Sequence, residues 1–402
     1  MRKIIDISSF SFYFVFARLV RFLLTIFDKK GPIDMAMISN YRDPVDVRKF
    51  GFWSVENLPD VLSWTRYIWE KKHKARLFMI GSITTNIGGD EATPETVNRA
   101  CDQFRKAVEI AVALGAKTIL YAAATKRLPI WEELNAMYPN VIFTLGDNFT
   151  GLLLGEGILT AFRRTNLNPK NSRVLIIAPY GFLGSIALNY VTNLGANVIG
   201  FGSPKRSDLL SGLKKKFGIE TCTSFEEAGK VDMVVACNSA AKSQLTRERV
   251  ELLRKPGKRL IVIDPNEPAN MPIELFKDSM GKVIRFDSGN GYSHRLVHVL
   301  EPITTWLLRL SRGISWGCFA ETFIIGAHPE LKGINWLKVT PENTMIIKKF
   351  LGSGKGQFIL PQPTCFNKPI KHFDLVQQNK WRMVWEELIG LRLIEGIRVL
   401  ML

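Results

Sequence analysis

Cys318 lies in an unusual setting, the segment SWGCFAET, where it stands between glycine and phenylalanine at the predicted start of a helix. A thiol at a helix N-terminus has its thiolate stabilised by unpaired N–H groups, and its pKa can fall well below about 8.5. The thiolate is the nucleophilic form of cysteine. From this segment alone, a buried and unreactive cysteine stays open as the alternative.

A second candidate site is the segment VLIIAPYGFLGS, residues 174–185, which predicts a buried strand, a glycine turn and a helix. This is the order of a dinucleotide-binding fold, and a second strand follows about twenty residues later, as that fold requires. The first fingerprint glycine is replaced by alanine, a mild departure because the side chain is still small. The residues expected to contact the nucleotide here are Ala178, Gly181, Phe182, Leu183 and Gly184.

The ends of the following strands indicate which nucleotide would bind. After the second strand, in NVIGFGSPKRSD, the acidic residue that would hold a ribose 2′-hydroxyl is absent, and Ser203, Lys205 and Arg206 stand there instead. Basic side chains favour a 2′-phosphate, hence NADPH over NADH. A solvated basic loop is the alternative. Polar residues at the later strand ends could meet the ribose and nicotinamide, or could cap loops: Asn238, Ser239 and Asp264.

The composition restricts the class of protein and its partners. The chain has 402 residues, 46% of them apolar, which suffices for two or three domains and excludes disorder. A net charge of +17 calls for an anionic partner: a nucleic acid, an anionic membrane, a nucleotide or an acidic protein. No nucleic-acid-binding module accompanies the charge, so we expect no nucleic-acid partner. Five scattered cysteines without a CxxC pair indicate no disulfide framework, no metal site and a reducing, cytoplasmic compartment.

The N-terminus is the most hydrophobic segment of the chain. On a helix its polar residues gather into one narrow stripe opposite a wide apolar face: Ser11, Arg18, Arg21, Thr25 and Asp28. Arginines near the centre of a spanning helix cost about 2.5 to 3.5 kcal/mol each, whereas a helix lying in the membrane surface keeps them among the headgroups. We therefore expect peripheral contact through residues 4–27, on the inner face of the membrane. A helix packed on protein is the alternative.

The order of predicted elements gives an α/β protein. Strands and helices alternate through residues 31–168, an N-terminal α/β substrate domain, and again through 169–310, a Rossmann-like, doubly wound, NADP-binding domain. Helical extensions precede and follow them, at residues 1–30 and 311–402, and the second carries Cys318. Within the first domain, residues 64–76 are predicted to form a basic helix.

Several segments resemble the long-chain acyl-[acyl-carrier-protein] reductases of cyanobacteria, a family that makes fatty aldehydes from acyl thioesters with NADPH. The similarity runs from about Phe52 to Gly333. The segments that show the similarity are FWSVENLPDVL, TLGDNFTGLLL, IIAPYGFLGSIALNYV, VIDPNEPANM and above all GCFAETFII. Both terminal helices lie outside it. Within it, the first fingerprint glycine is Ala178, and Pro265 and Asn266 replace a glycine pair.

The resemblance implies a reaction in two halves. Cys318 matches the acylated nucleophile of the family, which attacks the thioester, and hydride from NADPH then reduces the acyl-enzyme to an aldehyde. Glu321, one turn after Cys318, and His294, in a matching segment, are expected to move protons or orient groups, or to make structural hydrogen bonds. Residues expected to face the thioester or nicotinamide, or to cap a helix, are Asp147, Asn148 and Thr150.

Partners and rivals follow from the same reading. An acyl-carrier-protein or coenzyme A thioester is the expected partner, with residues 69–76 as a candidate docking helix for an acidic carrier. One rival is an NADP-dependent dehydrogenase of the shikimate or methylene-tetrahydrofolate type, which would use a Lys/Asp pair and would not need Cys318. A second rival is a non-catalytic, membrane-associated nucleotide-binding protein. The sequence leaves acyl length, the choice of carrier, the use of the product and oligomeric state open.

Overall fold

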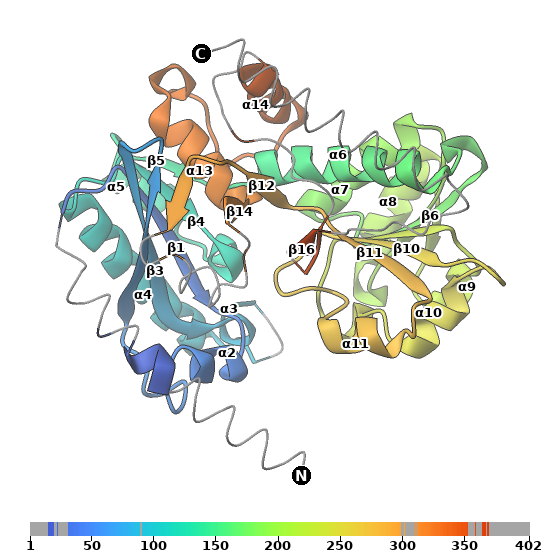
Figure 1. Ribbon diagram of the computed structural model, residues 1–402, viewed down its shortest axis with the longest axis horizontal. Helices are drawn as coiled ribbons and strands as arrows, with labels where there is room; N and C mark the ends of the chain where they lie inside the picture. Colours follow the sequence, from blue (N-terminus) through green and yellow to red (C-terminus); the bar gives the residue numbers. More distant parts are fainter. Residues whose placement is uncertain are drawn as a thin grey trace.

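The computed structural model describes residues 15–19, 22, 31–88, 91–298, 301, 310, 312–352, 358, 364–366 and 368–369. It is an α/β protein whose strands form two large sheets and one two-stranded ribbon (Figure 1). In the described part of the chain, no helix combines the length and hydropathy needed to cross a bilayer.

The first sheet has the strand order β13-β2-β3-β1-β4-β5. Strands β1, β3, β4 and β5 are parallel to one another. Strand β2 pairs antiparallel with β3, and β13 pairs antiparallel with β2. The strand bounds are β1 Met35–Tyr41, β2 Val61–Trp69, β3 His73–Ile83, β4 Thr118–Tyr121, β5 Ile142–Thr144 and β13 Leu296–His298. The α-helices of this part of the chain are α2 Pro44–Lys49, α3 Thr84–Gly88, α4 Pro94–Ala113 and α5 Trp131–Met137.

The second sheet has the strand order β16-β15-β11-β10-β9-β6-β7-β8. The stretch from β8 to β11 is parallel throughout, and its order is that of a doubly wound nucleotide-binding sheet. The bounds are β6 Arg173–Ile177, β7 Asn197–Phe201, β8 Glu220–Cys222, β9 Met233–Ala236, β10 Leu260–Asp264, β11 Val283–Asp287, β15 Thr364–Cys365 and β16 Lys368–Pro369. The helices are α6 Asp147–Thr165, α7 Phe182–Asn193, α8 Ser207–Phe217, α9 Phe225–Ala228, α10 Arg247–Leu253 and α11 Ile273–Asp278.

The apolar strands of the second sheet reflect burial on both faces. In β6, Val174 and Ile176 enter one hydrophobic core, and Leu175 and Ile177 enter the core on the other face. Because successive side chains of a strand point to opposite faces, such a strand must be apolar throughout. The predicted α/β class and doubly wound sheet are thereby confirmed.

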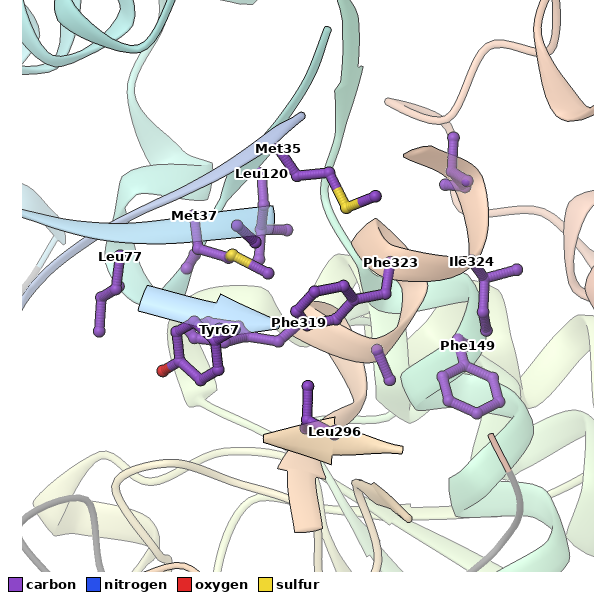
Figure 2. Close-up of a cluster of buried hydrophobic side chains, with 14 of the residues drawn as sticks. Met35, Met37, Tyr67, Leu77, Leu120, Phe149, Leu296, Phe319, Phe323 and Ile324 are labelled. Atoms are coloured by element: carbon purple, nitrogen blue, oxygen red, sulfur yellow. The ribbon is translucent and has the colours of Figure 1, made fainter. Parts of the chain in front are cut away.

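The chain returns to the first sheet before the predicted boundary at residue 310. Strand β13 pairs with β2, and β12 (Asn290–Tyr292) pairs with β14 (Ile314–Trp316). Helix α13 (Gly317–Ala327) then enters the core of the first sheet, where Phe323 and Ile324 are fully buried (Figure 2). A helix that is apolar all round must be enclosed on all sides, so residues 317–327 belong to the first domain and not to a separate extension. Helix α14 (Pro341–Gly352) follows.

The basic helix predicted at residues 64–76 is wrong, and with it the docking helix at residues 69–76. This segment forms the β2–β3 hairpin, whose turn residues Glu70 and Lys71 have φ of 54° and 61°. Positive φ at both central positions matches the twist of a tight hairpin. Of the two predicted terminal helices, only residues 15–19 and 22 are described, and they are helical. The predicted helix near the C-terminus, after residue 369, lies outside the described residues.

Candidate functional site

Cys318 occupies the first turn of α13, as predicted, and is half-buried. Two glycines allow its close packing. A Cβ on Gly146, which precedes α6, would overlap the Cβ of Cys318, and a Cβ on Gly317 would lie 2.7 Å from the carbonyl oxygen of Gly289. The first turn of α13 therefore sits between the start of α6 and the loop that follows β11.

That loop connects Cys318 to the expected nucleotide crevice. The Gly317 N–H donates to the Gly289 carbonyl at 2.6 Å, and Gly289 in turn packs against Pro265, the residue after β10. In doubly wound sheets, ligands bind in the crevice beyond the carboxyl ends of the strands. Cys318 thus lies beside the carboxyl ends of β10 and β11.

A buried ion pair lies next to the thiol. Lys126, at the end of the turn after β4, pairs with Asp147 at the first position of α6, and their side chains are only 18% and 8% exposed. Asp147 adjoins Gly146, which touches Cys318. The sequence reading did not include Lys126, although the signal used for Asn238, a polar residue soon after a buried strand, applies to it as well.

The electrostatics of the thiol differ from the expectation. Burial raises the pKa of Cys318 to about 11, and Asp147 and Glu321 push in the same direction. The nearby Lys126 ammonium and the Phe319 N–H lower this pKa, but burial prevails. The lowering of the thiol pKa that a helix N-terminus can give is therefore outweighed by burial in the free protein. A base or a bound substrate has to help ionise it.

Glu321 is fully buried one turn after Cys318. Its carboxylate accepts hydrogen bonds from the Thr144 hydroxyl at 2.6 Å and the Phe149 N–H at 2.7 Å. Burial raises its pKa to about 7, against the effect of these two bonds. A carboxyl that titrates near neutrality can hold or release a proton at physiological pH.

The remaining residues predicted to face substrate have other positions. Asn148 binds the backbone of Lys338 and Thr340, and the Thr150 hydroxyl donates to Gly146. These bonds hold the start of α6 in place. Of Asp147, Asn148 and Thr150, only Asp147 therefore takes part in the ion pair beside Cys318. His294 is exposed in the turn between β12 and β13, where Arg295 donates to it.

A different histidine of that segment lies nearer the site. His298 is buried, its ring centroid is 4.8 Å from that of Tyr67, and burial lowers its pKa to about 4. Tyr67 packs against Phe319, and burial, followed by the charge of Cys318, raises the pKa of its hydroxyl. His298 is therefore neutral at physiological pH. The sequence reading did not include either residue.

The turn after β6 has the geometry of a nucleotide cradle. Ala178 has φ of 56°, the left-handed region that glycine favours, so the chain keeps the glycine conformation without the glycine. A Cβ on Gly184 would overlap the carbonyl oxygen of Ala178, which is why this position excludes larger residues. Gly181 precedes α7. The first two residues of this helix differ in exposure: Phe182 is 50% exposed, and Leu183 is partly buried.

The predicted phosphate residues lie at the same edge of the sheet. Ser203, Lys205 and Arg206 are exposed after β7, and neither basic side chain has an acidic partner among the described residues. The Ser203 N–H donates to the Tyr180 hydroxyl at 3.2 Å, which joins this loop to the β6 turn. A glycine cradle beside unpaired cations fits a phosphorylated dinucleotide.

The later strand ends serve the fold. Asp264 is 2% exposed and accepts hydrogen bonds from Asn270, Met271 and Arg285. Asn238 accepts from the Ala240 N–H, and Ser239 lies beside it, partly exposed. Asp264 therefore holds the loop after β10, with its oxygens directed inward. Among the residues that the structure describes, no group of three or more His, Cys, Asp or Glu side chains could hold a metal ion.

No protein-family model and no curated protein matches the sequence. Among solved structures, L-tryptophan dehydrogenase from Nostoc punctiforme is similar at 12% identity, over 64% of this chain and 70% of that one, with a TM-score of 0.34. The A chain of dipicolinate synthase from Bacillus subtilis is similar at 13% identity, over 63% of this chain and 88% of that one, with a TM-score of 0.32. Quinone oxidoreductase from Coxiella burnetii is similar at 15% identity, over 53% of this chain and 49% of that one, with a TM-score of 0.26. The match therefore spans about half of that chain. Similarity this low carries no argument about activity.

Proposed function

We propose that this protein reduces a long-chain acyl thioester to a fatty aldehyde with NADPH, through an acyl-enzyme on Cys318. The observation that carries the proposal is the place of Cys318 in the first turn of α13, beside the carboxyl ends of β10 and β11. A nucleophile there faces the region where a doubly wound sheet holds its nucleotide. The motif GCFAETFII, which resembles the acyl-carrier-protein reductases, supports the same role.

In the first half, the Cys318 sulfur forms a bond to the thioester carbonyl carbon. The bond from that carbon to the carrier sulfur breaks, and the carrier leaves as a thiol after taking up a proton. Glu321, whose pKa is about 7, is the group suited to relay the proton that the Cys318 thiol loses.

In the second half, NADPH would supply a hydride to the acyl carbon and become NADP⁺, and the carbonyl oxygen would take up a proton from solvent. The residues that would hold it are the β6 turn from Ala178 to Gly184 together with Ser203, Lys205 and Arg206. The hemithioacetal left on Cys318 collapses to a free aldehyde and returns the thiol. An acyl-carrier protein or coenzyme A delivers the substrate, and the net charge of +17 suits either anionic carrier.

The deciding experiment is intact-protein mass spectrometry after mixing the protein with a long-chain acyl thioester in the absence of NADPH. We expect an added acyl mass on the wild type, none on Cys318→Ala, and loss of the adduct as aldehyde forms when NADPH is added. Cys365→Ala is a matched control, because Cys365 is also half-buried and burial raises its pKa to about 11 as well. No adduct with either carrier, while NADPH still binds, would reject the proposal.

A second candidate is the NADP-dependent dehydrogenase, and the Lys126–Asp147 ion pair favours it. In that enzyme the pair would exchange a proton with a substrate hydroxyl while hydride moves to or from the same carbon. It would keep its activity in Cys318→Ala, so the same variant separates the two candidates.

Peripheral contact with an anionic membrane is also part of the proposal. In the helix that contains residues 15–19, Ala17 is fully buried beside Gly51, whereas Val15, Leu19 and Phe22 are 65%, 50% and 62% exposed. At 100° per residue, Val15 and Leu19 lie on the side opposite Ala17. An apolar face turned away from the protein suits a membrane surface on a basic protein.

A further inference from the structure

Lys126 is a mostly buried lysine that has more N–H donors than hydrogen-bond partners. An ammonium group carries three N–H donors. Among the described residues, the hydrogen-bond partner of Lys126 is Asp147 alone. The side chain is 18% exposed, so surrounding protein shields most of it from water. Burial of a charge is expensive unless its hydrogen bonds are made, and a lysine kept in this state has donors to offer a ligand.

The position of Lys126 relates these donors to Cys318. Asp147, its partner, follows Gly146, and Gly146 packs directly on the Cys318 side chain. The Lys126 ammonium also has the largest effect of any charged group on the Cys318 thiol. The starts of α6 and α13 meet at the same point, and both bring the positive ends of their helix dipoles.

We propose that the Lys126 ammonium binds the carbonyl oxygen of the thioester while Cys318 attacks its carbon. As the sulfur–carbon bond forms, the carbonyl electron pair moves onto oxygen, and the free N–H donors of Lys126 stabilise that negative charge. When the pair returns, the bond to the carrier sulfur breaks. Asp147 holds the ammonium in place and does not touch the substrate. This assignment rests on the proposed function, because it requires an acyl transfer at Cys318.

The test compares two reactions of the same thiol. One is single-turnover acylation of Cys318 by a long-chain acyl-coenzyme A without NADPH. The other is alkylation by iodoacetamide, which displaces iodide and develops no charge on a carbonyl oxygen. Both are measured from pH 6 to 10 for wild type, Lys126→Met and Lys126→Arg. Lys348→Met is the control, since Lys348 also pairs with a carboxylate of α6, Glu156, but on the surface.

Removal of one oxyanion donor typically slows catalysis by about 100-fold to 1,000-fold. We expect a loss of that size in the ratio of acylation rate to alkylation rate for Lys126→Met at each pH, because the fraction of ionised thiol affects both rates equally and cancels in the ratio. Lys126→Arg should recover part of the rate, and Lys348→Met should match wild type. Equal losses in acylation and alkylation at each pH, which leave the ratio unchanged, would overturn the assignment and leave Lys126 as a group that only lowers the thiol pKa.

Two further outcomes are separable. Loss of Lys126 leaves the Asp147 carboxylate buried without its partner, so Lys126→Met can fail to fold. The double variant Lys126→Met/Asp147→Asn removes both charges and should show the same selective loss of acylation. If wild type itself is not acylated, the proposed function fails, whereas acylation of wild type and Lys126→Met at equal rates rejects the role of Lys126 alone.

Discussion

The backbone of Gly146 lies against the side chain of Cys318, so closely that no side chain fits at position 146. The contact joins the start of α6, which leads into the domain of the second sheet, to the start of α13, which carries Cys318. It also holds Asp147 and its partner Lys126 beside the thiol. The chemistry of Cys318 therefore depends on a glycine far away in the sequence.

Gly146→Ala should destabilise the protein and slow acylation of Cys318, because the new methyl group forces α6 and α13 apart. Gly218→Ala is the control: Gly218 has φ of 66°, against 71° for Gly146, but nothing lies within 4 Å of its Cβ position. The control should lose only the about 1 kcal/mol of left-handed strain. Thermal melting and single-turnover acylation measure both effects, and equal losses in the two variants would contradict the importance of the contact.

Ala178→Gly should stabilise the protein by about 1 kcal/mol, because alanine at φ of 56° is strained and glycine is not. Affinity for NADPH should hold or improve. Ala113→Gly, at the exposed last residue of α4, should instead destabilise by at most roughly 0.5 to 1 kcal/mol. Urea unfolding checks the signs. A destabilised Ala178→Gly would show that the methyl group has a packing role that outweighs its strain.

Replacement of Lys205 and Arg206 by alanine should weaken NADPH binding about tenfold or more, equivalent to at least 1.4 kcal/mol, and leave NADH binding unchanged. The physical reason is loss of the charge-assisted bonds to a 2′-phosphate. Alanines at Lys214 and Lys215, exposed on α8, remove equal charge from the same domain and serve as the control. Fluorescence titration gives both dissociation constants, and a parallel loss of NADPH affinity in the control would point to net charge alone.

Glu321 makes stability depend on pH. Because its folded pKa is about 7, raised from 4.5, the native state binds this proton more tightly than the unfolded chain. Its contribution is therefore present below pH 4.5 and is lost as pH rises to about 7, an effect of at most roughly 3 kcal/mol. Glu321→Gln removes it, so the stability of the variant relative to wild type should rise between pH 5 and 8. Urea unfolding across that range measures the difference, and a flat difference would mean that Glu321 titrates normally.

Leu19→Glu and Phe22→Glu should each reduce binding to vesicles that contain anionic lipid, because each places a carboxylate on the exposed apolar face. Met137→Glu is the control, since Met137 is 55% exposed on α5. Co-sedimentation with anionic and with neutral vesicles measures the effect. Binding that is unchanged in both face variants would remove the membrane from the proposal.

The doubly wound domain was predictable because its signals are local. Each strand is a short apolar run between turn residues, and the β6 turn carries its own fingerprint from Ala178 to Gly184. The β2–β3 hairpin was not, because its basic residues suggested a solvated helix while its period-two alternation is broken by apolar residues on both faces. Cys318 and Glu321 were predictable from one motif.

The rest of the site depends on contacts between distant residues. Lys126 and Asp147 are 21 positions apart, and no motif joins them. The pKa of Cys318 follows from burial, which helix position alone does not give. His294 matched a family segment, yet His298, four residues later, is the one that packs beside Tyr67, because the alternation of β13 turns that side chain inward.

The return of β13 and α13 to the first sheet makes the doubly wound unit an insertion within the first domain. Residues 173–287 supply the whole parallel stretch of the second sheet, whereas the first core needs Met35 and Phe323 together. Domains fold as units during synthesis. All parallel strands of the inner unit are therefore synthesised before the ribosome reaches α13. The outer domain, which contributes Cys318 and Lys126 to the candidate site, is complete only after the chain has been made past α13.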